Sequence, residues 1–238
     1  MPLVLHRGQA LFFVHVPKAG GTSVEIYLER RFGPLCAMDR NKRLGLRGTG
    51  LITPATHLAA CDLAEFIPAN ADLVFTLVRE PVGKLKSEYR YQTGVSRMSR
   101  LSFSTWLQVM LACLRLERRI YENHIRPQSE IVPEHCEVFH LERDGVAQII
   151  RRLDEVTGDP RPDLTPEHKN KRPQAPIRLS RQDIALIEQV FAADYARFGF
   201  DRTAVEDLPD DRFATMRAVF ARLIAPLIVW RQRLRWVS

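Results

Sequence analysis

Apolar residues along the chain form two patterns, short continuous segments and longer stretches with helical spacing. Continuous apolar segments at 10–16 and 72–78 predict buried β-strands, and a shorter segment at 137–141 predicts a third strand. The helical spacing predicts helices at 23–32, 58–66, 82–92, 102–115, 117–124, 144–156, 180–198 and 210–238. Continuous apolar strands that alternate with helices are typical of a central parallel sheet covered on both faces, so the pattern predicts an α/β fold.

The order of apolar, charged and proline-rich segments along the chain suggests one main domain and a C-terminal helix. Residues 1–208 are expected to form the domain, a size that suits a single α/β unit. Within it, 159–178 holds five prolines among many charges and is expected to be either a lid over a ligand or a plain surface connection. Residues 209–238 predict a basic amphipathic helix, whose apolar centre at 223–230 is too short to cross a bilayer. This helix is expected to dock either on the domain's own core or on a membrane surface or partner.

The charge favours proteins that bind anions, and the cysteine pattern disfavours zinc proteins and disulfide-bonded secreted proteins. The 238 residues carry a formal net charge of +7, which favours anionic partners such as phosphate, sulfate or acidic glycans. Only six of the 35 basic residues are lysines, so each lysine in a motif is informative. The four cysteines lack the paired spacing of a zinc site or a disulfide scaffold, and the first residues lack the apolar stretch of a signal peptide. We therefore expect a protein of the reducing cytoplasm without a metal centre.

The most informative segment is the sequence His-Val-Pro-Lys-Ala-Gly-Gly-Thr-Ser at 15–23, which joins a predicted strand to a predicted helix. A glycine-rich turn before a helix directs backbone N–H groups and the positive end of the helix dipole at one point, which suits a phosphate. His15 is expected to orient this loop. The lysine precedes the glycines, so the order differs from that of the nucleotide-triphosphate loop. The predicted phosphate-binding residues are Pro17, Lys18, Ala19, Gly20, Gly21, Thr22 and Ser23.

This loop resembles the phosphosulfate-binding loop of sulfotransferases that use 3′-phosphoadenosine 5′-phosphosulfate, in the bacterial form of the carbohydrate branch. A second segment, Arg-Glu-Pro at 79–81 followed by Ser-Glu-Tyr at 87–89, is similar to that family's signature for the 3′-phosphate. The resemblance implies that the loop amides hold the 5′-phosphate and that Lys18 contacts the oxygen between phosphate and sulfate. It also implies that Arg79 and Ser87 bind the 3′-phosphate. Supporting similarities at 124–128, 138–142 and 191–200 extend the likeness over roughly residues 10–202.

The same resemblance implies a fold and further contacts. The fold would be a three-layer α/β/α arrangement similar to P-loop nucleoside kinases. Lys169 and Lys171 would contact phosphate, although the family often has a serine at the position of Arg172. Lys84 stands where the family often carries an arginine. His124, Arg126 and Gln128 are expected either to face the acceptor or to serve capping and core packing.

Transfer to a hydroxyl needs a base, and His57 is the first candidate. The pattern places His57 at the start of the predicted helix 58–66, where the helix dipole would favour the neutral, proton-accepting imidazole. Its position between the two cofactor motifs also resembles that of the catalytic histidine in related carbohydrate sulfotransferases. His124 is the reserve candidate.

The sequence therefore predicts a sulfotransferase that moves a sulfuryl group from 3′-phosphoadenosine 5′-phosphosulfate to a hydroxyl of a carbohydrate or glycolipid and releases adenosine 3′,5′-bisphosphate. The alternatives are a nucleotide-dependent kinase of the same fold, for which the triphosphate-loop order is missing, and a basic module that binds an anionic polymer. No nucleic-acid reader motif is present, so nucleic acid is not an expected partner. The expected location is the cytoplasm, with peripheral attachment to the inner membrane through the C-terminal helix as an alternative.

Overall fold

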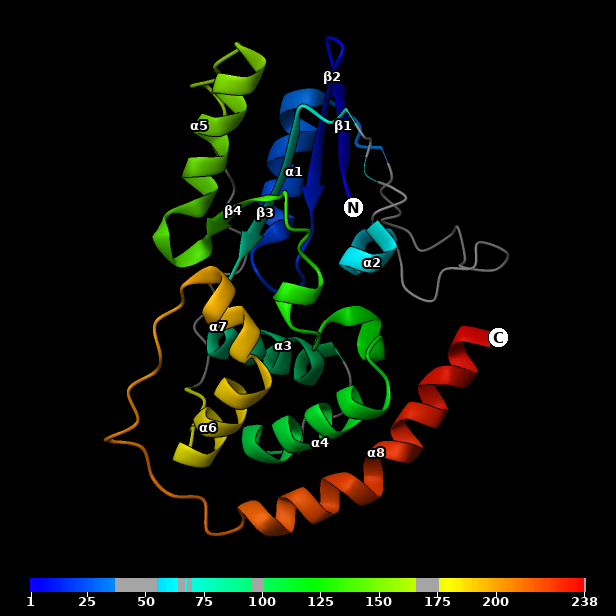
Figure 1. Ribbon diagram of the computed structural model, residues 1–238, viewed down its shortest axis with the longest axis vertical. Coiled ribbons are helices and arrows are strands. Elements are labelled where there is room, and N and C mark those ends of the chain that lie inside the picture. The colour runs from blue at the N-terminus through cyan, green and yellow to red at the C-terminus, as the bar shows by residue number, and fades with distance from the viewer. Residues whose placement is uncertain (37–54, 64–66, 68–69, 96–100, 166–175, 238) are drawn as a thin grey trace. The chain divides into compact units, whose positions relative to one another are not determined.

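The computed structural model describes residues 1–36, 55–63, 67, 70–95, 101–165 and 176–237 (Figure 1). The chain divides into two compact units, each built from two separate segments. The first unit comprises Met1–Arg79 and Gln128–Pro173, and the second comprises Glu80–Pro127 and Gln174–Ser238. The expected helix at 209–238 therefore belongs to the same compact unit as the helices that follow residue 80.

A four-stranded mixed sheet forms the centre of the first unit in the part of the chain that the structure describes. Its strands are ordered β1, β2, β3 and β4, with bounds Leu3–His6, Gln9–Val14, Leu73–Val78 and Glu137–His140. The predicted parallel arrangement is confirmed for β2, β3 and β4, where Leu11 pairs with Leu73 and Phe75 pairs with Glu137. A wholly parallel sheet was the wrong expectation, because β1 runs antiparallel to β2 at one edge.

Strand β1 and its turn have a local cause. Arg7 and Gly8, the two residues between β1 and β2, have φ values of 48° and 84°. Two successive residues with positive φ form the tight turn whose twist suits an antiparallel hairpin, and glycine adopts that conformation without strain. The short alternating segment before this turn is thereby fixed as an edge strand.

Helices α1 (Gly21–Phe32) and α5 (Gly145–Thr157) bury their apolar sides in one core with the sheet. Phe13 of β2 pairs with Phe75 of β3, and both side chains belong to this core. Paired residues of adjacent strands lie on the same face of a sheet, so this face is the one that the core covers. Helix α5 ends at Gly158, which has a φ of 63°, as the sequence predicted. The remaining described elements of the first unit are short: helix α2 (Ala60–Leu63) and the 3₁₀ turns Ala55–His57, Gln128–Glu130 and Leu141–Arg143.

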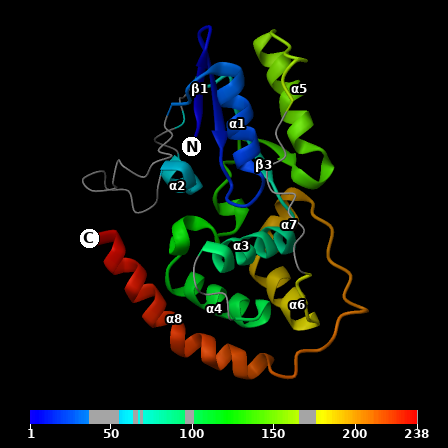
Figure 2. The ribbon, with the colours of Figure 1, turned by 180° about the vertical axis from the view of Figure 1, so that it is seen from behind.

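The second unit is helical in its described residues. Its helices are α3 (Pro81–Val95), α4 (Phe103–Leu116), α6 (Arg181–Val190), α7 (Ala192–Phe198) and α8 (Ala214–Val237), with a 3₁₀ turn at Ile120–Asn123 (Figures 1 and 2). They surround a core that contains the fully buried Trp106 and Phe191. The helix expected at 180–198 is divided at Phe191, which sits outside helical geometry with a φ of −103° and a ψ of 20°. None of the described helices is both long enough and apolar enough to cross a bilayer.

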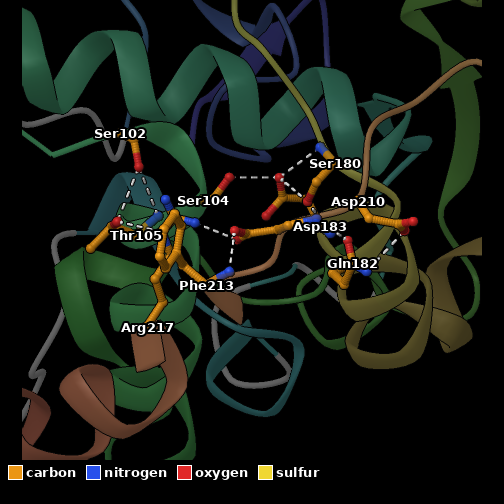
Figure 3. A network of polar contacts seen from close by, with 10 residues as sticks. Ser102, Ser104, Thr105, Ser180, Gln182, Asp183, Asp210, Phe213 and Arg217 are labelled. Atoms are coloured by element: carbon orange, nitrogen blue, oxygen red, sulfur yellow. Dashed lines mark hydrogen bonds and ion pairs between the residues drawn. The ribbon is translucent and has the colours of Figure 1, made fainter. Parts of the chain in front are cut away.

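Polar side chains fix the starts of several helices in this unit (Figure 3). Ser180 caps α6 by accepting the Asp183 N–H, and the Asp183 carboxylate accepts the Ser180 N–H at 2.9 Å. Ser104 of α4 donates to the same carboxylate at 2.8 Å. This carboxylate therefore links α4 to α6. Because Asp183 is only 3% exposed, loss of one of these hydrogen bonds would leave a buried polar group unsatisfied and lower the stability of the unit.

Candidate functional site

The loop between β2 and α1 has the backbone of a ligand-binding turn. Lys18 lies in the left-handed region with a φ of 64°, and Gly20 follows with a φ of 89° just before α1 begins at Gly21. A Cβ at Gly20 would also lie 3.1 Å from the Leu141 side chain, so both conformation and space favour glycine there. The first turn of α1 carries no acidic residue, so its N–H groups present an uncompensated positive pole.

The side chains of this loop divide into inward and outward groups. Pro17 and Ala19 are buried, Lys18 and Ser23 are half-buried, and Thr22 is exposed. The polar members of the loop are therefore at least partly accessible, while its apolar members are buried. This arrangement fits the donor set expected for an oxyanion, namely backbone N–H groups, hydroxyls and one mobile cation.

His15, which the sequence analysis expected to orient the loop, packs against the start of α1. The residue is 8% exposed, and its Nδ1 bonds to the Glu25 carboxylate on α1. Its ring lies so close to the start of α1 that a Cβ at Gly21 would be 2.9 Å from it. The His57 ring meets the His15 ring edge-on, with centroids 5.3 Å apart. The structure thus brings His57 beside the phosphate-loop candidate through one intervening imidazole.

The local setting of His57 differs from the prediction. His57 ends a 3₁₀ turn at Ala55–His57, and in the described residues helix α2 begins at Ala60 and runs to Leu63. The expectation that His57 opens the helix is wrong, because Leu58 and Ala59 separate it from α2. A helix within 58–66 is confirmed at Ala60–Leu63, and residues 64–66 lie outside the described part of the chain. Because His57 does not begin α2, the dipole of that helix is no reason for a neutral imidazole, and a described aromatic neighbour of the His57 ring is His15.

Arg79 brings a second cation to the loop from the end of β3. Its Nη1 donates to the Lys18 carbonyl at 3.4 Å, and its Nε lies 3.8 Å from a carboxylate oxygen of Glu142. Lys18 and Glu142 follow β2 and β4, the two neighbours of β3 in the sheet. The carboxyl ends of three parallel strands thus contribute to one place, which is where α/β sheets bind ligands.

Gln128 holds the backbone of Arg79 at both ends. Its Oε1 accepts the Arg79 N–H at 2.9 Å, and its Nε2 donates to the Arg79 carbonyl at 2.7 Å. Gln128 is fully buried. Its amide is committed to positioning Arg79, so the geometry favours the packing alternative over contact with an acceptor.

In the second unit, the start of α3 is capped by Glu80. The carboxylate accepts the N–H groups of Val82 and Gly83 at 2.7 and 2.6 Å, and Tyr195 donates to it at 3.3 Å. Burial and this carboxylate raise the pKa of Tyr195, so the phenol keeps its proton. Ser87, the other predicted 3′-phosphate residue, is half-buried in the second turn of α3.

Lys84 is a lysine for which the sequence predicted no contact. It is fully buried, and its Nζ donates to the carbonyls of His124 and Arg126 at 2.7 and 3.1 Å. Burial lowers the pKa of Lys84 to about 8, and the carboxylates of Asp194 and Glu88 oppose that shift. Lys84 therefore supports, from the interior, the segment that carries two predicted acceptor residues.

That segment is not the helix predicted at 117–124. Tyr121, Glu122 and Asn123 have φ values of 50°, 56° and 65°, so a left-handed turn interrupts the helical pattern. Non-glycine residues in this region are strained and persist only where the surroundings hold them. The hydrogen bonds from Lys84 are part of what holds the chain there.

His124 is oriented by a relay of buried polar groups. Its Nδ1 bonds to Glu88 at 2.8 Å, Gln92 donates to Glu88 at 2.8 Å, and Trp106 donates to Gln92 at 2.8 Å. A carboxylate on Nδ1 fixes the ring and leaves Nε2 as its second functional atom. Arg126 donates to the Asn123 side chain at 3.4 Å. The predicted residues Lys169 and Lys171 lie outside the described residues.

Comparison of the chain with protein-family models, curated proteins and solved structures finds no match.

Proposed function

We propose that the chain is a sulfotransferase that transfers a sulfuryl group to a hydroxyl of a carbohydrate or glycolipid. The observation that carries the proposal is the grouping of Lys18, the N-terminus of α1 and the Arg79 guanidinium at the carboxyl ends of parallel strands. Two cations and a helix pole suit a donor with more than one phosphate group. The donor is 3′-phosphoadenosine 5′-phosphosulfate, which supplies the sulfuryl group.

Each part of the first unit has a role in this proposal. The N–H groups at Gly20, Gly21 and Thr22 hold the 5′-phosphate, and Lys18 neutralises the oxygen that bridges phosphate and sulfur. Arg79 binds the 3′-phosphate, held in place by the Gln128 amide. The parallel order of β2, β3 and β4 and the loop after β2 support the finer expectation of a fold similar to P-loop nucleoside kinases. Ser87 stays a prediction from its motif.

The reaction forms a bond between the acceptor oxygen and sulfur while the bond from sulfur to the bridging oxygen breaks. The electron pair of the broken bond stays on the phosphate oxygen, whose charge Lys18 and the loop amides stabilise. The acceptor proton passes to a histidine, and His57 is the candidate in the unit that holds the loop. Its ring contacts His15, which Glu25 orients, so a positive charge arising on His57 lies one ring from a carboxylate. A positioned base of this kind contributes about 10²- to 10⁴-fold in rate.

Calorimetric binding of adenosine 3′,5′-bisphosphate and adenosine 5′-monophosphate tests the donor site. Wild type is expected to prefer the bisphosphate, because the Arg79 guanidinium meets the extra phosphate. Arg79→Ala should bind the two nucleotides about equally. Arg143→Ala, which removes an exposed arginine of the same unit, is the matched control and should keep the preference. An Arg79→Ala protein that still discriminates would overturn the assignment of the 3′-phosphate site.

Turnover distinguishes the sulfotransferase from a kinase. Sulfate transfer from radiolabelled donor to a panel of glycan and glycolipid acceptors should proceed in excess chelator, since the proposed stabilising charges are all side chains and amides. Phosphate transfer from ATP with a strict magnesium requirement would instead establish the kinase alternative.

A further inference from the structure

Helix α8 packs on the second unit through its small side. Helix α8 lies beside α4 (Figures 1 and 2). Ala221, Ala225 and Val229 recur at intervals of four residues, are at most 5% exposed and belong to the core that includes α4. The start of the helix is fixed by Arg217, whose Nε donates to Thr105 of α4 at 3.0 Å and whose guanidinium pairs with Asp211 (Figure 3). The orientation of α8 about its axis is therefore determined by packing at several points.

Seven of the bulky apolar residues of α8 lie on its other side and are exposed, whereas Ile224 and Ile228 are partly buried against the core. Leu223 is 72% exposed, Trp230 63% and Leu227 60%. The exposed apolar stripe, as we call this set, consists of Met216, Val219, Phe220, Leu223, Leu227, Trp230 and Leu234. A helix that served only to complete the core would bury its large residues and expose its small ones, so the inverted arrangement calls for a partner.

Helical geometry shows that the stripe is continuous. With about 100° of rotation per residue, its members fall within a sector of roughly 100° centred opposite Ala221, Ala225 and Val229. From Met216 to Leu234 the stripe runs about 27 Å along the helix at about 1.5 Å per residue. No polar residue between Met216 and Leu234 falls inside this sector. The feature is a convex, uniformly apolar ridge without an anchoring polar group.

The charges of α8 have one sign. Its 24 residues include five arginines and no aspartate or glutamate. Arg222 and Arg231 project toward opposite flanks of the exposed apolar stripe by the same rotation, and both are exposed. Neither forms an ion pair with a carboxylate within the ranges that the structure describes. Two exposed cations thus border an apolar ridge.

We infer that the exposed apolar stripe of α8 binds an anionic lipid surface, in which the helix lies parallel to the membrane plane. Apolar side chains enter the boundary between headgroups and acyl chains, Trp230 sits at headgroup depth, and the flanking arginines meet acidic headgroups. A second copy of the chain is a poorer occupant, because pairing two such faces brings arginines of like charge together. A flat surface also suits a convex ridge better than a pocket on a protein does.

Flotation of the full chain with lipid vesicles tests this inference. Wild type should bind vesicles that contain phosphatidylglycerol, and it should bind pure phosphatidylcholine vesicles less well. Leu227→Glu should lower the partition coefficient about tenfold or more, because it places a charge where apolar area is buried. The double variant Arg222→Gln/Arg231→Gln should lower it about fivefold per arginine on anionic vesicles only. Leu5→Glu changes a residue of β1 that is 66% exposed and should leave binding unchanged.

Trp230 provides a second signal. Its emission should shift to shorter wavelength on anionic vesicles, and Trp230→Phe should retain binding while losing most of the shift. Circular dichroism of Leu227→Glu and of a second variant, Leu223→Gln, confirms folding, which substitutions of such exposed residues should not disturb. Wild type that stays unbound, or Leu227→Glu that binds as well as wild type, would overturn the inference. Concentration-dependent dimers that Leu227→Glu dissociates, without vesicle binding, would assign the face to a second copy instead.

Discussion

Substitution of Lys84 by methionine removes a charge from the interior of the second unit while keeping an unbranched side chain. Burial lowers the pKa of Lys84 to about 8 from an ordinary value of 10.5. Between these two values the unfolded chain binds more protons than the folded chain. The free energy of unfolding of wild type therefore includes a term that rises with pH across this window, as the penalty of the buried charge is relieved.

The size of this term follows from the two pKa values. Linkage gives a gain of about 2 kcal/mol between roughly pH 7.5 and pH 9.5. Lys84→Met has no such term. The free energy of unfolding of wild type minus that of the variant should therefore rise by about 2 kcal/mol over that range. Burial raises the pKa of the Cys113 thiol to about 12, which lowers stability once unfolded thiols ionise. That contribution is present in both proteins and cancels in the difference.

Urea unfolding followed by tryptophan fluorescence measures the effect, since Trp106 is buried in the same core. Wild type, Lys84→Met and Lys84→Arg are compared at several pH values in the window. An arginine does not release its proton there, so Lys84→Arg should also lack the rising term. Parallel pH profiles for wild type and Lys84→Met would refute the claim that a buried ammonium supports the His124–Arg126 segment.

Three further outcomes are expected. Gly21→Ala should lower the affinity for adenosine 3′,5′-bisphosphate about tenfold by calorimetry, because its methyl group would meet the His15 ring; unchanged affinity would contradict the tight contact. His57→Ala should lower sulfate transfer roughly 100-fold or more with little change in bisphosphate affinity, and loss of turnover in His124→Ala alone would move the base to His124. In the folded protein at neutral pH, Cys113 should react with a thiol reagent far more slowly than the two exposed cysteines; equal rates would contradict its burial and raised pKa.

Local signals predicted the parts of the fold that local physics determines. The two continuous apolar segments correctly predicted β2 and β3. Gly20 in the loop after β2 and Gly158 after α5 correctly predicted turns, and both have positive φ values. Strand β1 was missed, although the alternation at Leu3–His6 before Arg7 and Gly8 is a hairpin signal that was open to notice.

Other errors have causes that lie far away in the sequence. The pattern at 117–124 is helical, yet Tyr121, Glu122 and Asn123 adopt left-handed conformations while Lys84, some 40 positions earlier, bonds the next carbonyls. Gln128 was expected either to face an acceptor or to serve capping and packing, and the partner that decides between the two, Arg79, lies 49 positions away. Neither contact leaves a trace in local spacing, because each depends on which segments the fold brings together.

The two-segment construction of each unit bears on how the protein is made by the ribosome. Residues 1–79 emerge first but complete their unit only with residues 128–173, and the helices after residue 80 wait for residues 174–238. Domains generally fold as units during synthesis. When the first unit completes its fold, the early helices of the second unit are therefore already outside the ribosome and exposed to solvent and chaperones. Those helices bury their full core only after α8 has been synthesised. A nascent chain stalled before α8 should therefore be a stronger chaperone client than the full-length chain.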